Sequence, residues 1–448
     1  MKGTLLIISC VSILILLTSG IIDLGALLSY ANQVRPAYIV KDNTAGNTIT
    51  NARATLGRVL FYDKKLSVNN TIACGSCHKQ QFAFGDTALR SLGVAGITNR
   101  HGMRLVNARF GTEARFFWDE RAATLENQTT RPIQDHIEMG FSGANGDPGL
   151  DSLIRKLSGI SYYNTLFAFA FGTSTITEAR MQDALAQFVR SMQSFDSRFD
   201  TGFAAAPNLG APFPNFTPGE NAGKALFLNP PGPGGGAGCQ GCHRAPEFDI
   251  DPASRNNNIL GNLVTPAVPD LTITRAPSLR DIVGPGGASN GAFMHDGSLA
   301  TLADVVNHYN SINFNTAVNN NLDARLAGPP GSGGQKLNFT QAQKDNLIAF
   351  LRTLTGKSIY TDPRFSDPFD ASGNITVSTS QGEPFVRIDG KTRLMVMDTL
   401  STGDYVVVRQ ADGTLAMRKN RLTVSLTGDT LYNGANWVII PGISAANH

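Results

Sequence analysis

Two copies of the pentapeptide C-x-x-C-H constrain this sequence of 448 residues more than any other feature. The first copy begins at Cys74 and ends at His78, and the second begins at Cys239 and ends at His243. Two thiols on one helical turn reach the two vinyl groups of a single porphyrin, and the histidine that follows then lies beneath the ring and binds its iron. The sequence therefore predicts two covalently bound haem c groups, with His78 on the iron of haem 1 and His243 on the iron of haem 2.

The four thiols of these motifs, Cys74, Cys77, Cys239 and Cys242, are all the cysteines of the chain except Cys10. Two C-x-x-C pairs could in principle close a zinc site with four sulfur ligands. A redox-active C-x-x-C would need a βαβ context, which neither flank offers. A histidine directly after each pair favours haem attachment over both alternatives.

An apolar N-terminal run predicts that the chain is exported. The run extends without charge from Leu5 to Ile22, behind Lys2. Its length lies between that of a signal-peptide core and that of a membrane-spanning helix. We therefore expect residues 1–30 to be a signal peptide or an N-terminal membrane anchor, and the rest of the chain to be periplasmic or otherwise exported. Cys10 is a weaker candidate for lipid attachment.

Charge and composition exclude one class of partner. The formal net charge is +3, and no basic cluster carries interleaved aromatic residues, so nucleic acid is not an expected partner. The length suggests two or three domains, and a hydrophobic content of 42% is enough for a core in each.

The pattern of the chain favours a mainly α fold with two cytochrome c-like haem domains and a small β-rich C-terminal appendage. Apolar residues at helical spacing predict a long amphipathic helix over 176–199. The Pro/Gly-rich stretch 206–218 then marks a domain boundary. Further helices are predicted over 55–62, 218–228, 299–309 and 340–356. The expected parts are the leader (1–30), an N-terminal domain (45–205), a C-terminal domain (206–361) and the β-rich appendage of unknown role (362–448).

With these motifs in this order, the chain resembles the bacterial di-haem cytochrome c peroxidase/MauG superfamily. The likeness extends over about 53–356 and leaves the appendage out. Besides the two haem motifs, it is carried by the blocks LGRVLFY at 56–62, FWDERA at 117–122, PIQDHIEM at 132–139, APSLR at 276–280 and FMHDG at 293–297.

The resemblance implies roles for two residues of these blocks. In the family the N-terminal haem is the peroxide site and the C-terminal haem relays electrons. Glu138 matches the acid/base that moves a proton between the two peroxide oxygens. Trp118 matches the tryptophan that lies between the haems as a stepping stone for electrons. His136 is a rival base, but it points to another side of its segment.

The resemblance also implies which residue, if any, binds each iron in addition to the histidine of its motif. Many members close the first iron with a histidine whose position falls here near Val94, which cannot ligate. We therefore expect a five-coordinate first iron, with His101 as the alternative ligand. At the second iron, Tyr309 stands where MauG-like members place tyrosine and peroxidases place methionine. A phenolate stabilises ferric iron, and Met294 and His308 are weaker candidates.

Calcium is a doubtful cofactor of this chain. Family members hold a calcium ion between the haems with an asparagine side chain and two backbone carbonyls. Here His101 replaces the asparagine, and the carbonyls would come from Asn290 and Ala292. Imidazole is a poor calcium ligand.

The resemblance predicts a di-haem c-type oxidoreductase that reduces hydrogen peroxide at the N-terminal haem with electrons relayed through the C-terminal haem. A small redox protein, either a cytochrome c or a cupredoxin, would then be the electron donor. One alternative is a MauG-like enzyme that oxidises a protein side chain, which Tyr309 and an open first iron favour. An alternative of another class is a di-haem electron-transfer protein without peroxidase activity, in which a residue such as His101 would close the first iron.

Overall fold

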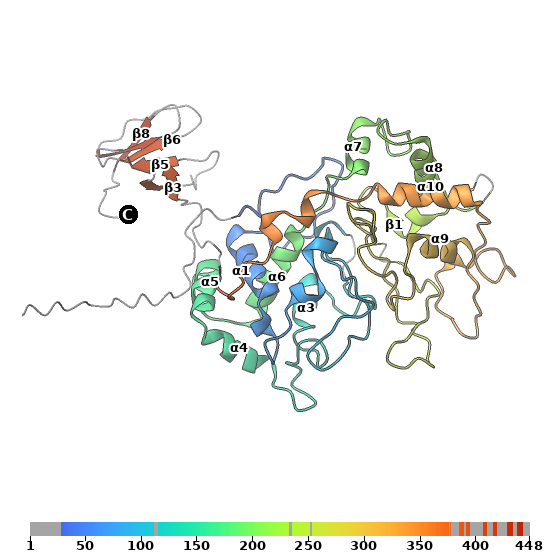
Figure 1. Ribbon diagram of the computed structural model, residues 1–448, viewed down its shortest axis with the longest axis horizontal. Coiled ribbons are helices and arrows are strands. Elements are labelled where there is room, and N and C mark those ends of the chain that lie inside the picture. The colour runs from blue at the N-terminus through green and yellow to red at the C-terminus, as the bar shows by residue number, and fades with distance from the viewer. Residues whose placement is uncertain are drawn as a thin grey trace, which may run out of the picture.

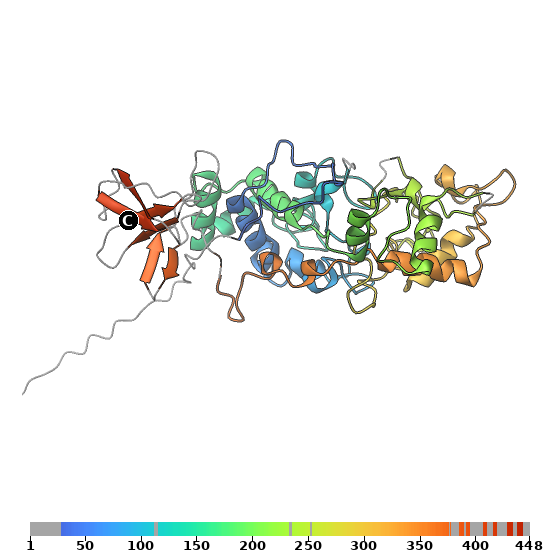
Figure 2. The same cartoon turned by 90° about the horizontal axis from the view of Figure 1, so that it is seen from above.

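The computed structural model describes residues 28–111, 115–232, 235–250, 253–375 and 377, and the backbone of six strands between 385 and 441. Residues 1–27 lie outside this part, so the predicted signal peptide or anchor stays a prediction. Within the described residues, no helix combines the length and the apolar character that crossing a membrane requires. Two mainly helical units lie side by side along the long axis of the molecule (Figure 1), and the view from above shows the same arrangement (Figure 2).

The first unit contains the first haem motif and is built mostly of short helices. Its α-helices are α1 (Asn51–Tyr62), α2 (Cys74–Cys77), α3 (Leu125–Thr130), α4 (Leu150–Ser158), α5 (Ser161–Phe171) and α6 (Glu178–Ser191). Its 3-10 helices are η1 (Lys64–Leu66), η2 (Gln80–Phe82) and η3 (Ala108–Phe110). The long connections between these elements carry most of the predicted site residues.

The second unit contains the second haem motif. Its α-helices are α7 (Arg198–Ala205), α8 (Pro218–Leu228), α9 (Leu302–Asn310) and α10 (Gln341–Arg352). Two short strands, β1 (His243–Arg244) and β2 (Asp249–Ile250), pair antiparallel. Its 3-10 helices are η4 (Cys239–Gly241) and η5 (Ala324–Leu326). Two more, η6 (Ser358–Tyr360) and η7 (Pro363–Phe365), follow α10 and pack into the core of the first unit.

Each unit is organised around one close helix crossing that depends on a glycine. In the first unit α1 crosses α6, and a Cβ on Gly57 would lie 2.0 Å from the carbonyl oxygen of Ala184. In the second unit α8 crosses α10, and a Cβ on Gly223 would lie 1.9 Å from the carbonyl oxygen of Asn346. Only a residue without a side chain permits either approach. The two units therefore repeat one packing solution.

The predicted helix over 176–199 is wrong in one respect, because it forms two helices instead of one. Asn107, which lies outside this segment, binds the backbone between the two helices. Its side chain accepts from the N–H of Ser194 at 2.9 Å and donates to the carbonyl of Ser194 at 3.0 Å. A new N-cap then begins α7, where Ser197 and Asp200 form a capping box. These long-range bonds outweigh the continuous apolar periodicity of the segment.

Along the chain, the buried residues switch from the first hydrophobic core to the second before the domain boundary predicted at 205/206. Met192 belongs to the first core, whereas Phe199 on α7 is fully buried in the second. The segment after α10 then returns to the first unit (Figure 1). Ile359, Phe365 and Ile375 are buried in the first core, although Phe365 and Ile375 fall within the predicted appendage.

The last described strands form three antiparallel pairs. These are β3 (Phe385–Ile388) with β4 (Lys391–Leu394), β5 (Val406–Arg409) with β6 (Leu415–Arg418), and β7 (Gly428–Tyr432) with β8 (Trp437–Pro441). The residues between them lie outside the described part. The mainly helical fold is thus confirmed for the haem-bearing part, and the β-rich appendage stays a prediction.

Candidate functional site

Each C-x-x-C-H motif opens onto its own cavity of about 630 Å³. The first cavity is lined by Cys77 and His78, and the second by Cys239, Cys242 and His243. A smaller hollow of about 60 Å³ adjoins the first cavity, shares His78 with it and adds Cys74. All four thiols are free of disulfides. Each predicted attachment site therefore lies beside a space large enough for a prosthetic group.

The ring of His78 is oriented by a backbone carbonyl. Its Nδ1 lies 3.2 Å from the carbonyl oxygen of Phe84, so Nδ1 carries the proton and Nε2 keeps a free lone pair for a metal. Burial lowers the pKa of His78, and it lowers that of His243 to about 4. Both imidazoles are thus neutral at pH 7, which is the state that binds iron.

Glu138 lines the first cavity together with His78. Burial, followed by the negative charge of Asp135, raises the pKa of Glu138 to about 7. The carboxylate of Asp135 also accepts hydrogen bonds from the backbone N–H groups of Ile137 (2.8 Å) and Glu138 (2.9 Å) and so fixes the turn. His136 is bound elsewhere, with its Nδ1 2.8 Å from a carboxylate oxygen of Asp147. Of the two predicted bases, only Glu138 lines the cavity.

The loop that would carry a histidine ligand in many relatives is packed here against the Glu138 turn. The N–H of Val94 donates to the carbonyl of Glu138 at 3.1 Å, and the N–H of Ala95 donates to that of Ile137 at 3.2 Å. A Cβ on Gly93 would lie 2.0 Å from the carbonyl oxygen of Ile137. The loop therefore presents an aliphatic residue, and no ligand, beside Glu138.

Trp118 and His101 line both cavities and so lie between the two haem motifs. The indole N–H of Trp118 donates to the carbonyl of His101 at 2.8 Å. The ring of His101 is buried, and its Nδ1 lies 3.0 Å from the carbonyl of Ala88 and 3.1 Å from that of Leu89. Its backbone N–H donates to the carbonyl of His295 in the second unit at 2.7 Å. This group of contacts forms the junction between the units.

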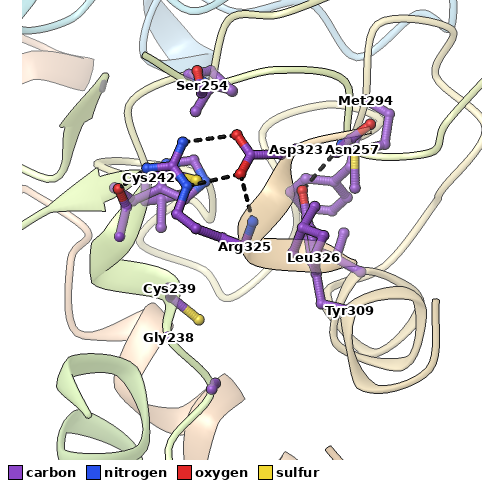
Figure 3. Close-up of a pocket in the computed structure, with 18 of the residues that line it drawn as sticks. Gly238, Cys239, Cys242, Ser254, Asn257, Met294, Tyr309, Asp323, Arg325 and Leu326 are labelled. Atoms are coloured by element: carbon purple, nitrogen blue, oxygen red, sulfur yellow. Dashed lines mark hydrogen bonds and ion pairs between the residues drawn. The ribbon is translucent and has the colours of Figure 1, made fainter. Parts of the chain in front are cut away.

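Tyr309 lies on α9 and points into the second cavity, where Met294 is also found (Figure 3). The side-chain NH₂ of Asn257 donates to the phenol oxygen of Tyr309 at 3.0 Å and to the sulfur of Met294 at 3.3 Å. Burial raises the pKa of Tyr309 above its usual value. His308 does not line the cavity, and its Nε2 donates to the backbone carbonyl of Asn257 at 2.9 Å.

The residues present fit two haem c groups. Arg104 lines both cavities, and its buried Nε finds no hydrogen-bond partner within the described residues. Burial lowers the pKa of Arg104 to about 10, so the guanidinium still carries its charge at pH 7. In the part of the chain that the structure describes, no carboxylate pairs with this guanidinium, which suits the propionates of a haem. Free thiols, two neutral imidazoles, of which that of His78 is oriented by a carbonyl, and this cation together match the needs of the cofactor.

The side chains do not test the doubtful calcium site, because two of its expected ligands would be the backbone carbonyls of Asn290 and Ala292. In the described part of the chain, no three His, Cys, Asp or Glu residues gather as metal ligands would. The amide of Asn290 donates to the carbonyl of Asp281 and to the phenol of Tyr360. Calcium therefore stays a doubtful prediction.

Comparison with known proteins places the chain in a family. The model of the di-haem cytochrome c peroxidase family matches residues 51–206. The methylamine utilization protein MauG of Methylorubrum extorquens is 31% identical over 319 residues, which span 69% of this chain and 79% of that protein. The chain belongs to the di-haem cytochrome c peroxidase/MauG family. The cytochrome c551 peroxidase of Nitrosomonas europaea is 25% identical over 376 residues, or 80% of this chain and 96% of that protein.

One solved structure agrees with this assignment. A MauG-like protein associated with microbial copper homeostasis matches with a TM-score of 0.59 and 30% identity, covering 75% of this chain and 99% of that one. The family is one of di-haem oxidoreductases with haem c, so the predicted family, enzyme class and haem cofactors are confirmed.

Two residues of the site were missed from the sequence. Asn257 stands in an asparagine-rich stretch that carries no motif, and Arg104 follows the Arg100–Met103 segment without a recognisable pattern. Only the three-dimensional cavity identifies them. The roles predicted for Glu138, Trp118 and Tyr309 stay predictions, but the fold brings each of them to a cavity wall.

Proposed function

We propose that this member of the family reduces hydrogen peroxide at the first cavity with electrons that arrive through the second. The observation that carries the proposal is the position of Glu138, a buried carboxyl group with a pKa of about 7 in the same cavity as the oriented imidazole of His78. Haem c held by Cys74, Cys77 and His78 would supply the iron that binds peroxide and exchanges electrons with it.

The proton chemistry of this reaction fits Glu138. Reduction of one hydrogen peroxide to two waters consumes two electrons and two protons. The carboxylate takes a proton from one peroxide oxygen and returns it to the other as the O–O bond breaks, which makes water the leaving group. An acid/base with a pKa near the working pH is best suited to do both. Val94, whose N–H is bound to the carbonyl of Glu138, offers no atom that could bind the iron in place of peroxide.

The path of electrons is proposed to run through Trp118. Its indole lines both cavities and is held by the carbonyl of His101. In the second cavity, His243 and Tyr309 would be the two iron ligands. The electron donor is proposed to be a small redox protein, a cytochrome c or a cupredoxin, in the compartment to which the N-terminal leader exports the chain.

A second candidate function is MauG-like oxidation of a protein side chain. The observation that favours it is Tyr309, whose phenol oxygen faces the second cavity as an anionic ligand would. In this case the protein substrate would itself be the electron donor. The third alternative, electron transfer alone, needs a ligand that closes the first iron. In His101 only Nδ1 is engaged, with the carbonyls of Ala88 and Leu89, so Nε2 is the atom that would have to close the first iron.

The test is the electronic and EPR spectrum of the ferric holoprotein before and after one equivalent of hydrogen peroxide. We expect one high-spin and one low-spin haem, and a rapid spectral change with peroxide. Two low-spin haems that do not respond to peroxide, even after half-reduction, would leave an electron carrier. Rapid turnover of peroxide with reduced cytochrome c favours the peroxidase, and turnover only with a protein substrate favours the second candidate.

A further inference from the structure

Asn257 makes the closest described polar contact with the phenol oxygen of Tyr309. Its side-chain NH₂ lies 3.0 Å from this oxygen and 3.3 Å from the sulfur of Met294. Figure 3 shows the bond between Asn257 and Tyr309 as a dashed line in the wall of the second cavity. One amide thus touches both Tyr309 and Met294, two side chains of this cavity that could bind the iron held by His243.

The orientation of this amide is fixed by its surroundings. The side-chain oxygen of Asn257 accepts from the backbone N–H of Ile259 at 3.1 Å, so the NH₂ group must point the other way. The backbone carbonyl of Asn257 accepts from Nε2 of His308, the neighbour of Tyr309 on α9. If the amide were turned over, its oxygen would face Tyr309. Its NH₂ group would then face the backbone N–H of Ile259, and two donors would meet without an acceptor.

The loop that carries Asn257 is itself held firmly. The fully buried Asn256 accepts at its side-chain oxygen from the N–H of Asn258 (2.7 Å) and from the amide of Asn319 (2.9 Å). The amide of Asn258 donates to the carbonyl of Asn313 at 2.8 Å. A donor on such a rigid loop has a defined position towards its acceptor, which is what tuning of a metal ligand requires.

We propose that Asn257 is a positioning residue that fixes the Tyr309 oxygen as an anionic ligand of the second haem iron. The inference rests on the proposed function, in which Tyr309 binds that iron. A phenolate ligand keeps lone pairs that accept an N–H donor, and a donated hydrogen bond draws electron density away from the oxygen. Asn257 thereby weakens the donation of Tyr309 to iron and raises the reduction potential of the second haem.

The variant Asn257→Asp tests this role with little change of shape. An aspartate keeps the oxygen that accepts from Ile259, but it offers no donor to Tyr309 and adds a negative charge. Asn257→Leu removes the donor without the charge and serves if the aspartate variant fails to incorporate haem. We expect both variants to lower the midpoint potential of the second haem and to shift its iron–phenolate bands in resonance Raman spectra.

Three matched variants make the outcome decisive. Asn315→Asp makes the same substitution at an exposed residue of the second unit that lines none of the cavities, where an aspartate keeps the oxygen that accepts from the N–H of Ala317, and it should leave potential and Raman bands unchanged. Met294→Leu separates the two acceptors of the amide: it should keep the iron–phenolate bands, because these belong to the Tyr309 oxygen and not to the sulfur. Wild-type potential and bands in both Asn257 variants overturn the proposal. Tyr309→Phe should abolish the phenolate bands, and if it leaves the second haem unchanged, Tyr309 is no ligand and the proposed coordination fails separately.

Discussion

The indole nitrogen of Trp118 donates a hydrogen bond to the backbone carbonyl of His101 at 2.8 Å. The carbonyl of Trp118 in turn accepts from the N–H groups of Thr274 (3.1 Å) and Arg275 (3.2 Å) in the second unit. The residue is therefore held from both units, with its ring on the walls of both cavities. We predict that Trp118→Phe uncouples the haems: peroxide still changes the spectrum of the first haem, but the change at the second haem is slowed or lost. Stopped-flow spectroscopy checks this.

Trp437, in β8, provides the control for the loss of an indole, since it is the other tryptophan of the chain. Trp437→Phe should leave both spectral changes at wild-type rates. An unchanged response of the second haem in Trp118→Phe would mean that electrons take another path between the units.

Loss of the Glu138 carboxyl group should slow the reaction with peroxide without loss of haem. Positioned general acid/base groups contribute about 10² to 10⁴-fold to rates, so we expect a reduction of that size in Glu138→Gln. Glu178→Gln is the matched control, because Glu178 lines none of the cavities and uses one oxygen to accept from Thr130 and Gln134. Equal rates in Glu138→Gln and Glu178→Gln would remove Glu138 from the mechanism.

The rate of the peroxide reaction should depend on pH through Glu138. Burial and the charge of Asp135 raise the pKa of Glu138 to about 7. Only the deprotonated carboxylate accepts a proton from peroxide, so the rate should rise with pH through about 7 and fall below it. Asp135→Asn keeps the acceptor oxygen for the turn but removes the charge, and should shift the midpoint to lower pH. A midpoint that stays fixed in this variant would assign the titration to another group.

Removal of one pair of thiols should halve the covalent haem. The double variant Cys239→Ser/Cys242→Ser is expected to keep one haem c, at the first motif, and Cys74→Ser/Cys77→Ser the other. Haem staining of denatured protein and its intact mass measure this directly. Two covalent haems in either double variant would contradict the assignment of the motifs.

Features that depend on a local pattern of residues were predictable from the sequence. The spacing of the thiols before His78 and His243 is set by their covalent attachment to a porphyrin. The motif can therefore be recognised without knowledge of the fold. The α8 helix was predicted with the bounds that it has, since Thr217, Pro218 and Glu220 form a complete N-terminal signal within a few residues.

Features that depend on a contact with a residue far away in the chain were not predictable from the sequence. The periodicity of 176–199 gave no sign that Asn107 would bind Ser194 and end α6 at Ser191. The return of Phe365 to the first core was equally hidden, because the apolar character of a residue does not reveal which core receives it. Asn257 has no signal in the sequence at all, since its role depends on a contact with a residue 52 positions away.

The last prediction concerns stability. Arg280, in one of the family blocks, is completely buried and binds both oxygens of Asp200 at 2.9 Å. Although burial alone would raise it, the pKa of Asp200 is lowered by this guanidinium. The pair joins α7 to the loop before the second cavity. Arg280→Met leaves the carboxylate buried without its cation, which costs about 3–5 kcal/mol. Urea unfolding of the holoprotein should show this loss.

Two further variants test whether this loss of stability comes from the buried carboxylate of Asp200 without its cation. Arg280→Met/Asp200→Leu removes both charges and should recover part of the stability. Arg35→Ala breaks the more exposed contact with Asp42 and should cost at most about 1 kcal/mol. Since the folded-state pKa of Asp200 is depressed, its contribution is present above the unfolded-state pKa of about 4. That contribution is lost as the pH falls through the lower folded-state value, so wild type and Arg280→Met should converge in stability in acid. A cost in Arg280→Met no larger than that of Arg35→Ala would show that the buried pair does not hold the second unit together.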